Sequence, residues 1–120
     1  MDRKVAKEFL HLREWLEKAM ELVDVGRAAY VEDGLRQEAG DSLMMKIGEA
    51  ANRLSRAGVA APEGISWADA VANRNWLIHQ YDEIDRKLTW ETLARDLPAL
   101  REASQNAFID AELYLKGESE

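Results

Sequence analysis

Apolar residues recur every three or four positions along most of this chain, and this spacing constrains the fold more than any other feature. Over the first 23 residues the stripe consists of Val5, Phe9, Leu12, Leu16, Ala19 and Val23. Between about residues 35 and 56 it contains Leu43, Ile47, Ala50 and Leu54. Such a period is typical of amphipathic helices, and no segment shows the sustained alternation of a strand. The sequence therefore predicts an all-α fold.

Turn and capping residues divide the first two thirds of this pattern into three helices. The segment 24–34 weakens the first stripe, so we expect a bend there, with Gly34 as the break. Gly58 stops the second helix. Ser66, with an acidic residue three positions later, approximates a capping box for a third helix over residues 67–80.

The last third of the chain predicts one or two further helices. Asp85, at the end of a short acidic turn, is placed to cap a helix over residues 86–97. Pro98 suits the first turn of a final helix, which we expect to fray at Gly117, leaving residues 117–120 loose. The expected architecture is an antiparallel bundle of four to five helices.

Length and composition limit the kinds of site that this bundle can carry. A chain of 120 residues suits a single domain, residues 1–120, that folds without a disulfide or metal. It contains no cysteine and two histidines, which excludes thiol chemistry and argues against a transition-metal site. We therefore expect neither a metal nor a cofactor.

Charge and hydropathy bear on the partners and the compartment. The net charge of −7 argues against broad electrostatic binding of nucleic acid, although one or two arginines could still act locally. No run of apolar residues is long enough for a signal peptide or a membrane span. We expect a cytoplasmic protein that does not bind membranes.

One charged residue contradicts the apolar pattern of the third predicted helix. At 100° per residue, Arg74 lies in the middle of the apolar face, on the same side as Tyr81. A charge there is unfavourable unless it is paired or faces a wet pocket. For an isolated arginine, a packed stem with its head in water would be the simpler interpretation.

The surroundings of Arg74 favour a pocket instead. Asn75, His79 and Tyr81 follow within two helical turns, and together these side chains can bind an anion or transfer protons to it. Glu49, on the second helix, could orient Arg74 or could face solvent.

The same residues resemble a known family. Arg74, His79 and Tyr81 form an Arg-x4-His-x-Tyr motif that resembles the signature of the HEPN-superfamily ribonucleases. The flanking segments, from about residue 40 to 101, look like the HepT family, also known as DUF86: MKIGEAANRLS, ISWADAVANRNWLIHQYDEID and LTWETLARDLPAL. Asn73 departs from the pattern, in which an apolar residue is expected, and this affects packing more than chemistry.

This resemblance implies a specific function. HepT proteins are toxins of toxin–antitoxin modules whose antitoxin is a minimal nucleotidyltransferase called MntA. The resemblance implies a homodimeric, metal-independent ribonuclease with RNA as its substrate. Arg74 and His79 would be catalytic and line a cleft between subunits, and the antitoxin would neutralise the toxin by transferring AMP to Tyr81. The role of Asn75 in orienting the phosphate, and that of Glu49 in orienting Arg74, fit such a cleft.

A second hypothesis comes from a different functional class. The chain could be a non-catalytic subunit that binds a nucleotide or a protein partner within a nucleotidyltransferase complex. The negative charge favours this alternative, whereas the intact Arg-x4-His spacing favours the enzyme.

Overall fold

The computed structural model describes residues 1–72 and 84–119, in which helices are the only regular secondary structure. The elements are α1 (Arg3–Asp24), α2 (Arg27–Glu32), α3 (Gly34–Arg56), α5 (Arg86–Glu91), a π-helical turn (Thr92–Asp96), α6 (Leu97–Ala103) and α7 (Gln105–Ser119). Residues 67–72 are also helical. The predicted all-α bundle is confirmed.

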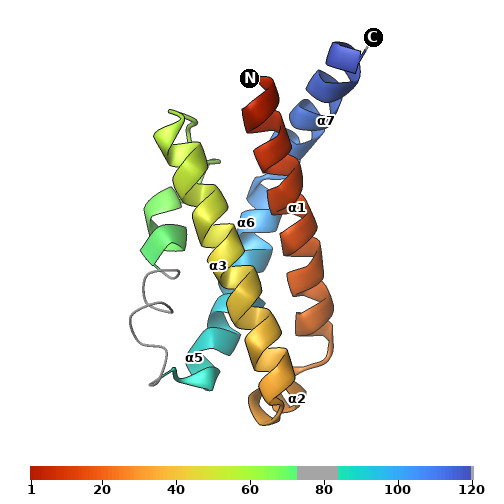
Figure 1. The fold of residues 1–120 in the computed structure, drawn as a ribbon. Helices are drawn as coiled ribbons and strands as arrows, with labels where there is room; N and C mark the ends of the chain where they lie inside the picture. The colour runs from red at the N-terminus through yellow and green to blue at the C-terminus, as the bar shows by residue number, and fades with distance from the viewer. Residues whose placement is uncertain (73–83, 120) are drawn as a thin grey trace.

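The chain makes three long passes along the bundle (Figure 1). The helix α1 runs down the bundle and α3 returns beside it, and α5, α6 and α7 then follow one another from the end near α2 and α3 to a position beside α1. Most of the packing between helices joins α1 to α3 and α1 to α7. The helix α1 is therefore the central element of the bundle.

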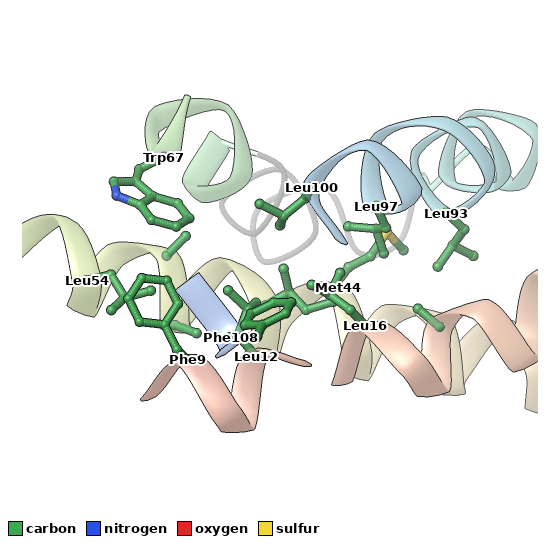
Figure 2. Close-up of a cluster of buried hydrophobic side chains, with 14 of the residues drawn as sticks. Phe9, Leu12, Leu16, Met44, Leu54, Trp67, Leu93, Leu97, Leu100 and Phe108 are labelled. Carbon is green, nitrogen blue, oxygen red and sulfur yellow. The ribbon is translucent and has the colours of Figure 1, made fainter. Parts of the chain in front are cut away.

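The predicted stripes supply the core. In α1, Phe9, Leu12 and Leu16 are almost completely buried. Their partners on α3 include Ile47 and Leu54, which are each 1% exposed. Figure 2 shows α6 and the π-helical turn closing the core, with Leu93, Leu97 and Leu100 pointing towards Met44 and Leu16. Small buried residues on α3, Gly48, Ala50 and Ala51, allow the close approach expected from the sequence.

The segment between the first two long helices differs from the prediction. Where we expected a bend broken at Gly34, the chain forms the short helix α2, which places Tyr30 in the core at 0% exposure. The break lies one residue earlier, because the Asp33 side chain accepts a hydrogen bond from the Leu35 N–H and caps α3. Gly34 is instead the first residue of α3.

The C-terminal third also has more breaks than predicted. Asp85 does cap α5, accepting a hydrogen bond of 2.9 Å from the Lys87 N–H. However, the expected single helix over 86–97 contains the π-helical turn, and the final helix is interrupted at Ser104. The helix α7 then runs from Gln105 to Ser119.

In the part of the chain that the structure describes, no helix is both long and apolar enough to cross a bilayer.

Candidate functional site

Four of the five residues predicted to form the site lie in one short segment. Arg74, Asn75, His79 and Tyr81 fall within residues 73–83, outside the residues that the structure describes. The fifth, Glu49, lies on α3 and is half-buried. The described residues show how the chain on either side of the segment packs against α3.

The helical residues 67–72 fix the N-terminal end of the segment. Trp67 is 7% exposed and packs near Leu54 of α3 (Figure 2). Its indole Nε1 donates a hydrogen bond of 3.0 Å to the carbonyl oxygen of Val59, in the preceding loop. Ala70 and Val71 also pack against the core. This helix is therefore attached to α3 at the point where the segment begins.

We expect Trp67→Phe to lower the free energy of unfolding by about 1–2 kcal/mol, because it removes an indole hydrogen bond and part of a buried ring. Chemical denaturation followed by circular dichroism measures this change. Trp15→Phe is the control, since Trp15 is only partly buried and its indole donates no hydrogen bond to a described residue. Equal losses in both variants would contradict a specific anchoring role for Trp67.

A buried ion pair fixes the C-terminal end. Nη1 of Arg86, in the first turn of α5, lies 2.6 Å from Oδ1 of Asp41 on α3. The two side chains are 22% and 9% exposed. Hydrogen bonding to Asp41 raises the pKa of Arg86 above its already high ordinary value, and the Tyr30 hydroxyl adds to the rise.

Two further side chains extend this pair into what we call the Asp41 cluster: Asp41, Arg86, Tyr30 and Thr89. The Tyr30 hydroxyl lies 2.5 Å from the Thr89 hydroxyl, which itself donates to the backbone carbonyl of Arg86. The Tyr30 ring also packs on Trp90, with 5.6 Å between the ring centroids. The cluster thus joins α2, α3 and α5 directly after the segment that holds the motif.

The Asp41 cluster was not predicted from the sequence, although the position of Asp41 on α3 gives a local signal for it. Asp41 lies three, seven and ten residues before Met44, Gly48 and Ala51, which are all buried. It is therefore a charge within an apolar stripe, the same anomaly that singled out Arg74. Arg86, its partner, is 45 residues away, and no local spacing indicates it.

A hollow of about 440 Å³ runs along α3 between Asp41 and Glu49. The described residues that line it are Glu38, Asp41, Ser42, Met45, Lys46 and Glu49. Glu49 carries its charge near Arg53, one turn further along α3, where it contributes to raising the pKa of Arg53, although hydrogen bonding to Glu8 is the larger cause. Glu49 thus lies beside a hollow on α3.

Within residues 1–72 and 84–119, no three histidine or acidic side chains are grouped closely enough to hold a metal ion.

A family model for HepT-like ribonucleases ("Ribonuclease HepT-like") matches residues 12–107. The chain belongs to this family. The match begins near the middle of α1, ends in α7 and includes the positions of the Arg-x4-His-x-Tyr motif, so the resemblance inferred from the motif and its flanking segments is confirmed at the level of the family. No solved structure matches the chain significantly.

Proposed function

We propose that this chain is the ribonuclease toxin of a HepT/MntA-type toxin–antitoxin module and that it cleaves RNA without a metal ion. The observation that carries this proposal is the HepT-like ribonuclease match over residues 12–107, within which the chain has the complete motif. Arg74 and His79 are the proposed catalytic residues.

The chemistry of RNA cleavage explains why these residue types are needed. Attack by the 2′-hydroxyl on the adjacent phosphate requires a base, an acid and a group that stabilises the developing charge on phosphorus. A histidine can serve as base or acid near neutral pH. We assign this role to His79, charge stabilisation to Arg74, whose guanidinium can bind a phosphate through two hydrogen bonds, and orientation of the phosphate to Asn75.

A homodimer would provide the second acid–base group. The other histidine of the chain, His11, is exposed on α1 and lies beside Trp15, with 5.8 Å between the ring centroids. We therefore propose that the second group is His79 of another copy, across a cleft lined by both motifs.

The packing at both ends of the motif segment supports this proposal. Catalytic groups act efficiently only when the scaffold holds them in position. Trp67 attaches one end to the core, and the Arg86–Asp41 pair attaches the other to α3. Glu49 and the hollow along α3 lie on the helix to which both ends are attached.

The decisive experiment is cleavage of single-stranded RNA by the purified protein in the presence of EDTA. We expect the rate to be the same with EDTA as with added Mg²⁺, because no step in the proposed mechanism uses a metal. Activity that EDTA abolishes would contradict the metal-independent mechanism.

We propose that AMP transfer to Tyr81 neutralises the toxin, because a bulky anion beside Arg74 would block the phosphate-binding position. In this transfer the Tyr81 oxygen bonds to the α-phosphate of ATP, its hydroxyl proton is lost and pyrophosphate leaves. Incubation with a cognate MntA-type nucleotidyltransferase and ATP should therefore increase the mass of the chain by one or more AMP units, measured by intact mass spectrometry. Tyr81→Phe should accept none. Tyr114→Phe is the matched control, since Tyr114 is a partly exposed tyrosine on α7, and it should be modified normally. Modification of Tyr81→Phe at the wild-type level would remove Tyr81 from the mechanism.

The net charge of −7 favours one alternative function, that of a non-catalytic subunit that binds a nucleotide or a protein within a nucleotidyltransferase complex. Such a subunit would bind the nucleotidyltransferase without cleaving RNA. The EDTA experiment distinguishes the two functions, because only the toxin cleaves RNA.

A further inference from the structure

A second hollow, of about 310 Å³, lies at the end of the bundle where the N-terminus of α1 meets the C-terminus of α3. Both ends lie together at the end of the molecule away from α2 (Figure 1). The residues that line the hollow are Asp2, Lys4, Val5, Glu8, Arg53, Leu54, Arg56 and Ala57. Charged side chains surround an apolar floor, and this combination suits a nucleotide unit, whose base is apolar on its faces and whose phosphate is an anion.

Both carboxylates of this hollow are already engaged. Asp2 caps α1 by accepting a hydrogen bond of 2.8 Å from the Val5 N–H. Glu8 accepts two hydrogen bonds from Arg53, at 2.9 and 2.7 Å, and these bonds raise the pKa of Arg53. The acidic groups therefore have partners within the bundle.

Two cations of the same hollow remain available to a ligand. Lys4 and Arg56 are exposed, and neither forms an ion pair with another described residue. The lining carries three basic and two acidic side chains, a local excess of positive charge in a chain whose net charge is −7. This hollow can therefore attract a polyanion locally, although the chain as a whole is acidic.

We propose that this hollow binds one nucleotide of a single-stranded RNA, with Lys4 and Arg56 contacting the phosphates on either side of it and the exposed parts of Val5 and Ala57 contacting the base. The inference rests on the proposed function for the identity of the polyanion. It adds an RNA-binding site on a surface outside the motif segment. Such a site explains how a protein with a net negative charge binds negatively charged RNA, because the positive charges that contact the RNA lie together in one hollow.

A matched pair of cations tests this proposal. Lys18 on α1 and Arg36 on α3 lie further along the same two helices. Each already has a carboxylate nearby, since Lys18 lies 3.7 Å from Glu14 and Arg36 lies 3.2 Å from Asp33. Lys4→Gln/Arg56→Gln and Lys18→Gln/Arg36→Gln therefore remove the same total charge, and the same two residue types, from two different places on α1 and α3.

Fluorescence anisotropy with a labelled 12-nucleotide single-stranded RNA measures binding, in a His79→Ala background that prevents cleavage. We expect Lys4→Gln/Arg56→Gln to raise Kd on the order of tenfold. It should also reduce the slope of log K against log salt by about 1.4, two phosphate contacts at about 0.7 each. The control pair should change Kd less than threefold. Circular dichroism checks that each variant is folded.

Two outcomes would overturn the proposal: equal weakening by both pairs of substitutions, or an unchanged salt slope for Lys4→Gln/Arg56→Gln. The cleavage assay separates this failure from failure of the proposed function. If the protein cleaves RNA but binds it equally well without Lys4 and Arg56, the proposed RNA-binding site is wrong and the proposed ribonuclease function stands. If the protein binds RNA through Lys4 and Arg56 but does not cleave it, the binding site stands and the proposed ribonuclease function is wrong.

Discussion

His79→Ala should reduce the rate of RNA cleavage by about 10²–10⁴-fold, the range expected when a general acid or base is removed. Arg74→Ala should reduce it by about 10²–10³-fold, because it removes a positive charge from the developing charge on phosphorus. Single-turnover cleavage of a labelled RNA measures both effects on the chemical step itself. Neither variant should change the unfolding transition by more than about 1 kcal/mol if its role is chemical rather than structural.

Two controls test whether these losses are specific. His11→Ala removes the other histidine of the chain, which is exposed on α1, and should leave the rate unchanged. Arg74→Lys keeps the positive charge but loses the two parallel hydrogen bonds, so it should be intermediate between Arg74→Ala and the wild type. Equal cleavage by His79→Ala and the wild type would show that the activity comes from a contaminant or from other residues.

Asp41→Ala should lower the free energy of unfolding by about 2–3 kcal/mol. The substitution leaves the guanidinium of Arg86 without its carboxylate in a largely buried position, and breaking a buried pair costs about 3–5 kcal/mol when both groups are fully buried. We reduce this value because Arg86 is 22% exposed. Urea denaturation measures the change. The ordinary pKa of an arginine is already far above pH 9 and that of Arg86 is raised further in the folded state, so its side chain is charged in both states from pH 5 to 9 and its ionisation should not make the loss vary with pH in that range.

An exposed ion pair provides the control for this loss. Arg101 binds Glu17 with hydrogen bonds of 2.6 and 3.2 Å, but on the surface of the bundle, so Glu17→Ala should cost less than about 1 kcal/mol. Replacing both buried partners, as in Asp41→Leu/Arg86→Met, should recover most of the stability, because no charge is then left unpaired. A double variant less stable than Asp41→Ala would contradict this explanation.

The long helices could be predicted because their signals are local. Each apolar stripe of α1 and α3 is complete within a segment of 22 or 23 residues, so periodicity alone locates both helices to within a few positions. The short helix α2 has no such stripe. It is fixed by the burial of Tyr30 against Trp90 and Thr89, which lie about 60 residues further along the chain.

The interruption at Ser104 was missed for a related reason. No glycine or proline marks this position, and the flanking residues Leu100 and Phe108 continue one buried stripe across it. Ser104 is itself fully buried, and its hydroxyl has no hydrogen-bond partner among the described residues. No local signal in the sequence therefore marks this break.

The residues of the candidate site also fall into two groups, those that a local pattern in the sequence predicts and those that it does not. Its proposed catalytic residues were found because Arg74, His79 and Tyr81 lie within eight consecutive positions and form a motif. The residues that attach the segment to α3 were not found, because Arg86 and Asp41 meet only after the chain has folded back on itself.

The π-helical turn at Thr92–Asp96 determines how α5 is rotated about its own axis. A π-helical turn accommodates one more residue than an α-helical turn of the same helix. Deleting one residue there would merge α5 and α6 into a continuous α-helix and rotate everything that precedes the turn by about 100° relative to α6. Arg86 would then point away from Asp41. The orientation of Arg86 towards Asp41 therefore depends on the extra residue that the π-helical turn accommodates.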